Sequence, residues 1–278
     1  ASDKLEEIIP ESEIIFVATP SKIINDVLDR LSDFSMDNKM IISCTKGIHE
    51  KPFMTMSETI EKHFNKSSIK VGVLSGPNLA REIADEKVAG TVIASKHADL
   101  CNLGREILSS STFKIYTSTD TQGIELAGAL KNIYAIISGY CHSLDVGENA
   151  IGLILTRSMA EMSNFAVSKG ANPITFLGLA GMGDLVATCF SKLSRNYQFG
   201  WAIGEGLDIE AAKNKVGQVA EGLNTIKIIH NEISSSEIKM PLVSGMHEIL
   251  FNNGSKELLL EQIVNSEIYV DVNFDVES

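Results

Sequence analysis

The chain has 278 residues, of which 44% are hydrophobic, and its formal net charge at pH 7 is -12. This length can bury one large core or two modest ones. The acidic balance argues against a partner such as nucleic acid or an anionic membrane, because both need a concentrated basic surface. A phosphate-bearing ligand would therefore have to be held by a local cluster of cations.

Localisation and metal content are predicted from what the sequence lacks. No apolar run reaches the roughly 18 residues that span a bilayer, which predicts no membrane insertion, and the first residues do not form a signal peptide. The four cysteines, at 44, 101, 141 and 189, show no C-x-x-C spacing, which indicates reduced thiols and a cytoplasmic protein. The six histidines are scattered and none pairs with another at metal spacing, so we predict no metal site.

Strands and helices alternate in the first part of the chain. Residues 14–18 form a continuous apolar run, typical of a strand in a parallel sheet with both faces covered. Similar strand-like runs, separated by helical stretches, lie at residues 40–44, 71–74, 91–94 and 113–117. This pattern predicts a doubly wound α/β sheet over residues 1–119, with ligands in the loops after its strands. Lys46 and Gly76 occupy such loops, although an exposed loop lysine and an ordinary turn are also compatible with the pattern.

From about residue 120 the strand pattern stops, and apolar residues recur at helical spacing. Leu126, Leu130, Ile133 and Ile137 form one stripe, with Lys131 one residue off it. A lysine on such a helix can be buried against a ligand with a lowered pKa, or it can extend to the surface. Further helices are predicted over residues 151–169, 221–233, 241–251 and 256–264. Residues 120–278 are thus expected to form an all-helical substrate and dimerisation domain with an acidic tail after residue 265, in which residues 268–270 could pair as a strand.

A candidate site lies in the stretch from Phe176 to Gly200. Glycines 178, 181 and 183 have the reverse of the G-x-G-x-x-G order that marks a dinucleotide-binding turn. We interpret them as a flexible turn that lets Asp184 begin a helix, where an acid suits the positive end of the helix dipole. A simple helix cap explains Asp184 equally well. The Arg195-Asn196 pair that follows adds a guanidinium and an amide, donors suited to a phosphate.

The order of six motifs gives a resemblance to a known family. These motifs are G-L-A-G-x-G-D-L with T-C (178–189), L-S-R-N (193–196), S-G-P (75–77), G-A-L-K-N (128–132), T-K-G (45–47) and V-x-E-G (219–222). With them, residues from near 2 to about 260 resemble bacterial NAD(P)-dependent glycerol-3-phosphate dehydrogenases.

The resemblance implies a partial Rossmann-type sheet followed by a helical domain, and hydride transfer between NAD or NADP and dihydroxyacetone phosphate. The product, sn-glycerol 3-phosphate, would feed glycerophospholipid synthesis. Lys131 would exchange the proton and Asp184 would hold its ammonium. The implied substrate-binding residues are Lys46, Gly76, Asn78, Asn132, Thr188, Ser194, Arg195 and Asn196. The implied cofactor-binding residues are Lys46, Ala80, Arg195, Val219 and Glu221.

The G-x-G-x-x-G turn itself is not found in the sequence. Residue 1 resembles the run-up to the family's fourth strand, so we expect about two βα units, roughly 60 residues, to be missing at the front. Two alternatives stay open: a related two-domain hydroxy-acid dehydrogenase, and a truncated, non-catalytic helical module for binding or dimerisation. A homodimer is expected because the long apolar helices present more hydrophobic surface than one small domain can bury.

Overall fold

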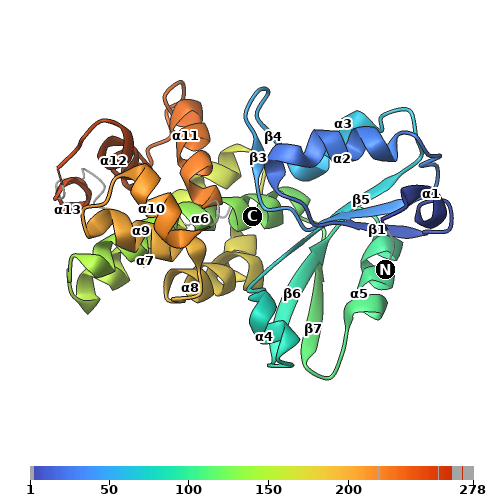
Figure 1. Cartoon of the computed structure of the whole chain (residues 1–278), viewed down its shortest axis with the longest axis horizontal. Helices are drawn as coiled ribbons and strands as arrows, with labels where there is room; N and C mark the ends of the chain where they lie inside the picture. The colour runs from blue at the N-terminus through green and yellow to red at the C-terminus, as the bar shows by residue number, and fades with distance from the viewer. Residues whose placement is uncertain (1–2, 218–219, 256, 265–270, 272–278) are drawn as a thin grey trace. The chain divides into compact units, whose positions relative to one another are not determined.

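The computed structural model describes residues 3–217, 220–255, 257–264 and 271 (Figure 1). The chain divides into two compact units. The first, the sheet unit, comprises Ala1–Lys131 and Ala166–Ala187, and the second, the helical unit, comprises Asn132–Phe165 and Thr188–Ser278. Two long helices, α6 (Thr121–Ser143) and α7 (Glu148–Ser168), contribute residues to both units. The acidic tail predicted after residue 265 lies, apart from Asp271, outside the described residues.

Five strands of the described residues form the main sheet of the first unit. They are β1 (Ile14–Val17), β2 (Met40–Ser43), β5 (Lys70–Ser75), β6 (Ala89–Ala94) and β7 (Phe113–Ser118). Their order across the sheet is β1-β2-β5-β6-β7. The predicted strands are therefore present, but the sheet is mixed rather than purely parallel, because β6 runs antiparallel to β5 while the other pairs are parallel. Only the short α4 (Ala80–Ala84) lies between β5 and β6, and a short connection returns the chain antiparallel to the strand that it leaves.

Helices cover both faces of this sheet (Figure 1). On one face, α2 (Ile24–Leu31) and α3 (Met56–His63) bury their apolar residues with Ile41 of β2. On the other, α5 (Ala98–Leu108) packs with Ile42, the next residue of the same strand. Successive side chains of a strand point to opposite faces, so a run that is apolar at every position requires both layers of helices.

Short elements complete the sheet unit. They are α1 (Leu5–Ile8), η1 (Ser21–Ile23), the two-stranded pair β3 (Ile48–His49) and β4 (Met54–Thr55), and the turns η2 (Pro173–Leu177) and η3 (Leu179–Gly183). The last two are 3-10 and π-helical and precede α8 (Asp184–Cys189).

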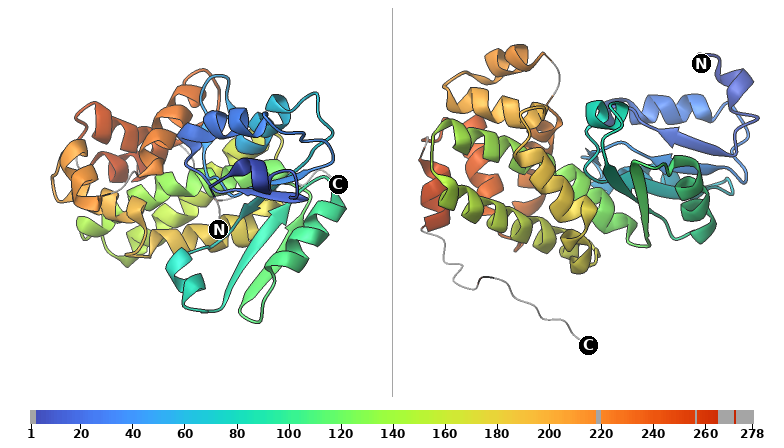
Figure 2. Two further views of the ribbon diagram at one scale, coloured as in Figure 1. Left: turned by 45° about the vertical axis from the view of Figure 1, so that its right-hand side comes forward. Right: turned by 90° about the horizontal axis from the view of Figure 1, so that it is seen from below.

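The helical unit contains no strand among its described residues (Figures 1 and 2). Besides parts of α6, α7 and α8 it consists of α9 (Arg195–Gly204), α10 (Ile209–Val216), α11 (Glu221–Ile233), α12 (Pro241–Phe251) and α13 (Leu258–Val264). In the part of the chain that the structure describes, none of the helices combines the length and the apolar character that crossing a membrane requires.

Candidate active site

Lys46 lies just beyond the carboxyl end of β2. The Thr45 hydroxyl donates to the carbonyl of Thr19 at 2.9 Å, which fixes the loop that follows the strand. The Lys46 ammonium donates to the carbonyl of Gly76 at 3.1 Å and to Oδ2 of Asp184 at 2.7 Å. The loops after β2 and β5 are thus joined at the sheet edge where α/β folds bind their ligands.

Asp184 is delivered to Lys46 by the glycine-rich turn. The π-helical turn η3 ends at Gly183, and Asp184 opens α8, as predicted. A side chain at Gly181 would place its Cβ 2.2 Å from the carbonyl oxygen of Phe176, so this close turn requires glycine. The Asp184 side chain is 2% exposed.

Lys131 reaches the same carboxylate from α6. Gly128, one turn earlier, allows this helix to approach the end of β5, because a Cβ there would lie 2.4 Å from Oγ of Ser75. The Lys131 side chain is 8% exposed and its ammonium donates a hydrogen bond to Oδ1 of Asp184. Of the two alternatives for this lysine, the structure shows the buried one.

The three side chains form a cluster of two ammonium groups and one carboxylate. Burial is the main cause that lowers the pKa of Lys131 to about 8, and repulsion from Lys46 lowers it further. Asp184 acts in the opposite direction and only partly offsets these causes. The proton on Lys131 is therefore exchangeable near neutral pH.

Next to this cluster, burial raises the pKa of the Cys44 thiol to about 11, although the positive charge of Lys46 acts to lower it.

Two polar atoms beside the cluster are suited to receive a ligand. The Asn78 amide nitrogen donates to Oγ1 of Thr91 at 2.8 Å, and this hydroxyl in turn donates to the carbonyl of Ser75. Oδ1 of Asn78 and Oγ of Ser75 are buried and have no hydrogen-bond partner among the described residues. Buried polar atoms are rarely left unsatisfied without a functional reason. Ala80, another predicted cofactor contact, is exposed at the start of α4.

In the helical unit, Asn132 and Asn196 form a second polar group. The Asn196 amide nitrogen donates to Oδ1 of Asn132 at 2.9 Å, and its own Oδ1 accepts from the backbone N–H of Gly222 at 3.0 Å. A side chain at Gly222 would collide with the Asn132 carbonyl oxygen at 2.5 Å. One amide thus connects α6, α9 and α11.

The remaining predicted residues of this unit lie at or near helix ends. The Ser194 hydroxyl caps α9 by accepting from the N–H of Tyr197 at 3.3 Å, and Arg195 is exposed at the first position of that helix. Thr188 is buried on α8, and Glu221 opens α11. Val219 lies outside the described residues.

The structure therefore brings the predicted residues together in two groups, one within each unit. Lys46, Gly76, Lys131 and Asp184 make direct contacts in the sheet unit, while Asn132 and Asn196 do so in the helical unit. Sequence reasoning did not single out Ser75, whose buried Oγ has no hydrogen-bond partner among the described residues, although its position at the end of a strand was a usable signal.

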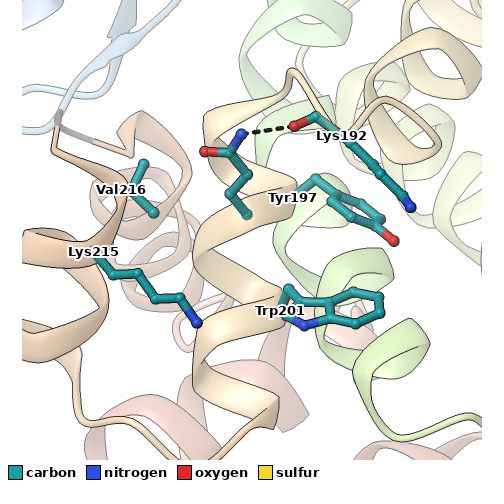
Figure 3. Close-up of a pocket in the computed structure, with 6 residues that line it drawn as sticks. Lys192, Tyr197, Trp201, Lys215 and Val216 are labelled. Atoms are coloured by element: carbon teal, nitrogen blue, oxygen red, sulfur yellow. Dashed lines mark hydrogen bonds between the residues drawn. The ribbon is translucent and has the colours of Figure 1, made fainter.

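It also missed a cavity lined by α9, α10 and the segment before α9, shown in Figure 3. The cavity has a volume of about 370 Å³ and is lined by Lys192, Tyr197, Gln198, Trp201, Lys215 and Val216. The Tyr197 and Trp201 rings project from the same helix, with centroids 6.1 Å apart. Lys215 is paired with Glu205 at 2.5 Å, and none of the predicted site residues lines this cavity.

Comparison with known proteins decides the family. Residues 1–101 match the NAD-dependent glycerol-3-phosphate dehydrogenase N-terminus, and residues 120–261 match the C-terminus of the same family. The chain belongs to the NAD-dependent glycerol-3-phosphate dehydrogenase family. The family predicted from the six motifs is thereby confirmed.

Individual relatives agree with this assignment. The chain is 47% identical over 263 residues to a glycerol-3-phosphate dehydrogenase [NAD(P)+] of Pseudomonas putida, covering 95% of this chain and 76% of the relative. It is 44% identical over 276 residues to the corresponding enzyme of Alcanivorax borkumensis, covering 99% and 80%.

Solved structures confirm the fold class, a Rossmann-type sheet followed by a helical domain. A crystal structure of glycerol-3-phosphate dehydrogenase from Coxiella burnetii superposes with a TM-score of 0.88 at 31% identity, covering 94% of this chain and 79% of that chain. The yeast enzyme, from Saccharomyces cerevisiae, gives 0.84 at 26% identity, with 94% and 78% covered.

Proposed function

We propose that Lys131 and Asp184 carry the proton transfer of the glycerol-3-phosphate dehydrogenase reaction. The activity follows from the family: the chain is an NAD(P)-dependent oxidoreductase that interconverts dihydroxyacetone phosphate and glycerol 3-phosphate. The predicted enzyme class and cofactor, NAD or NADP, are thereby confirmed. The two alternatives, a hydroxy-acid dehydrogenase and a non-catalytic module, are not favoured. The observation that carries the residue assignment is the buried Lys131 ammonium held on Asp184 beside Lys46.

The residues present fit a cofactor at the ligand edge of the sheet. Oγ of Ser75 and Oδ1 of Asn78 are buried polar atoms that lack a protein partner in the described part of the chain. Lys46 keeps 23% of its side chain exposed although it is paired with Asp184, so a ligand can approach this end of the cluster. We assign Lys46, Gly76, Asn78 and Ala80 to ligand contacts on the sheet unit.

The protein's part in the chemistry is to place and exchange a proton. When bound, the reduced nicotinamide supplies the hydride that adds to the carbonyl carbon. Lys131 donates a proton from its ammonium to the carbonyl oxygen as that atom gains negative charge, which completes the alcohol. In the reverse direction neutral Lys131 accepts the hydroxyl proton. Asp184 accepts hydrogen bonds from both lysines and so keeps Lys131 in one position.

We assign the phosphate to the start of α9. Arg195 presents an exposed guanidinium at a helix N-terminus, where the helix dipole and the fork of N–H donors both favour an anion. Ser194 caps this helix and is buried. Both ends of the Asn196 amide are occupied within the protein, so we assign this residue to positioning Asn132 and α11. Thr188 and Asn132 are proposed as polar substrate lining, and Arg195, Val219 and Glu221 as cofactor contacts.

The homodimer expected from the sequence remains a proposal. The helical unit exposes several large apolar side chains, among them Phe190 at 48% and Leu193 at 51%. Exposed apolar residues of this kind favour burial against a partner subunit. Sedimentation of the purified protein tests this proposal, and a single monomer boundary at all concentrations would reject it.

Replacing Lys131→Met tests the assignment of the proton donor. We expect kcat for reduction of dihydroxyacetone phosphate, followed by NADH or NADPH absorbance, to fall by about 10²- to 10⁴-fold, the usual contribution of a general acid. Lys114→Met, which removes an exposed lysine of β7, is the matched control and should leave kcat unchanged. Comparable activity in the two variants would remove Lys131 from the mechanism.

A further inference from the structure

Two histidines and a glutamate meet between α11 and α12, and none of them is among the residues assigned to the reaction. His230 lies in the last turn of α11, and His247 and Glu248 are consecutive residues of α12. The two imidazole rings are stacked, with centroids 3.7 Å apart and an interplanar angle of 3°. The sequence gives no sign of this pairing, because the two histidines come from different helices.

The donor atoms of these residues converge. One ring nitrogen of each histidine and one carboxylate oxygen of Glu248 all lie within 4.8 Å of one another. Nδ1 of His247 is 3.8 Å from Oε1 of Glu248, and it is buried without a hydrogen-bond partner among the described residues. A buried nitrogen beside a carboxylate, but too far for a hydrogen bond, lacks a partner that a cation could provide.

A fourth residue orients the carboxylate. The amide nitrogen of Asn252, one turn after Glu248, donates to both carboxylate oxygens at 3.0 Å. Hydrogen bonds of this kind fix the ligands of metal sites, and their removal commonly weakens binding about 10- to 100-fold. The cluster thus has both donors and a partner that holds one of them in place.

We propose that His230, His247 and Glu248 bind one first-row divalent transition ion, such as Zn²⁺, in a site that joins α11 to α12. Two imidazole nitrogens and one carboxylate oxygen suit this class of ion rather than Mg²⁺ or Ca²⁺, which prefer oxygen ligands. Water completes a tetrahedral arrangement.

Binding an ion here would require the side chains to move closer together. Ligand atoms about 2.0–2.2 Å from a tetrahedral ion are roughly 3.3–3.6 Å from one another, so separations of 3.8 Å and of at most 4.8 Å must shorten by up to about 1.5 Å. Rotation about the side-chain bonds of the two histidines supplies this shift and ends their stacking. Lys227, whose ammonium lies 4.5 Å from the Phe251 ring centroid, is the nearby cation, and because it is exposed it can turn to solvent.

The ion would not take part in hydride transfer. Its role would be to join α11 to α12, and the second residue of α11 is Gly222, whose backbone N–H donates to Oδ1 of Asn196. Occupancy would therefore stabilise the helical unit against thermal unfolding.

Zinc binding to the metal-stripped full chain tests the proposal. Competition with a chromophoric chelator should give one Zn²⁺ per chain, and Co²⁺ should give the visible absorbance of a tetrahedral site without cysteine ligands. His247→Gln and Glu248→Gln should each weaken binding by at least about tenfold. The control is His63→Gln, which removes a histidine that lies 3.7 Å from Asp29 and 2.8 Å from the Ser32 hydroxyl in the other unit.

Several outcomes would overturn it. These are the lack of a one-to-one complex, an unchanged affinity in both the His247 and the Glu248 variants, and a Co²⁺ spectrum with thiolate bands. Circular dichroism checks that the variants fold, and the half-exposed Glu248 gives a substitution that spares the core. A rise in Tm with Zn²⁺ for the parent but not for Glu248→Gln would support an ion that joins α11 to α12.

Discussion

Each unit of the molecule buries a carboxylate, but the two are surrounded by different partners. In the sheet unit, Asp184 faces the ammonium groups of Lys46 and Lys131. In the helical unit, Glu161 of α7 accepts hydrogen bonds from the Tyr134 hydroxyl at 3.0 Å and from the N–H of Leu242 at 2.7 Å. The first arrangement places the Lys131 ammonium, whose pKa is lowered to about 8, beside the partly exposed Lys46. The second is buried and anchors the first turn of α12.

A third carboxylate shows that the type of partner, rather than the unit, makes this difference. Glu125 of α6 lies in the sheet unit, yet it accepts from the N–H of Ser57 at 3.0 Å and from the Ser57 hydroxyl at the start of α3. Burial raises the pKa of Glu125 to about 7 and that of Glu161 to about 8. The two carboxylates that anchor helix ends thus have pKa values near neutral pH, while the one with two ammonium partners is the one that we propose for the chemistry.

Among the three carboxylates, removing the charge of Asp184 should have the largest effect on activity and stability. In Asp184→Asn, two neighbouring ammonium groups lose their anion, so kcat should fall about 100-fold and the free energy of unfolding by about 3 kcal/mol. Dihydroxyacetone phosphate reduction and denaturant unfolding measure the two quantities. Asp99→Asn, which breaks the exposed pair with Lys70, is the control and should change neither. Full activity in Asp184→Asn would refute the cluster as the catalytic group.

The pH dependence of the reaction should report the pKa of Lys131. Reduction needs the protonated lysine, so its kcat should decline as pH rises through about 8, while kcat for glycerol 3-phosphate oxidation should rise over the same range. Lys46→Met removes a repulsion that lowers this pKa, so both curves should move to higher pH. Lys70→Met deletes a lysine outside the cluster and should leave them in place. Unmoved curves in Lys46→Met would mean that another group titrates.

The smallest effect on catalysis is expected at Glu161. Its pKa is about 8 in the folded protein against an ordinary value of 4.5, so its contribution to stability is complete below pH 4.5 and is lost as pH rises to about 8. Glu161→Gln keeps an acceptor for Leu242 but cannot ionise. Its stability should therefore fall less than that of the parent between pH 5 and 8, with kcat unchanged. Parallel stability curves for the two proteins would contradict this role.

The sequence predicts the strands well because their evidence is local. An apolar run such as residues 40–43 can be buried only where helices cover both faces of a sheet, and this arrangement is observed. The antiparallel direction of β6 could not be predicted, because it depends on how a short connection returns along the sheet. The sequence also predicted that Asp184 begins a helix, because glycines favour a turn and an acid is favoured at the first position of the helix that follows.

The site could be predicted only in part. Motif resemblance named Lys46, Lys131 and Asp184, but no spacing rule reveals that both lysines share one carboxylate, because the contacts join residues far apart in the chain. Glu125 and Glu161 were missed, although an acid inside an apolar helical stretch is a signal of buried pairing. The pairing of His230 with His247 depends on how α11 packs against α12, so no periodic pattern in the sequence predicts it.

The amide of Asn196 joins three helices through two hydrogen bonds of opposite direction. Its nitrogen donates to Asn132 and its oxygen accepts from Gly222, so the two ends are not interchangeable. Asparagine is among the thermolabile residue types, and hydrolysis of this side chain would put a carboxylate oxygen against the Asn132 oxygen, where a donor is needed. A change of one atom at this residue would then loosen α6, α9 and α11 together.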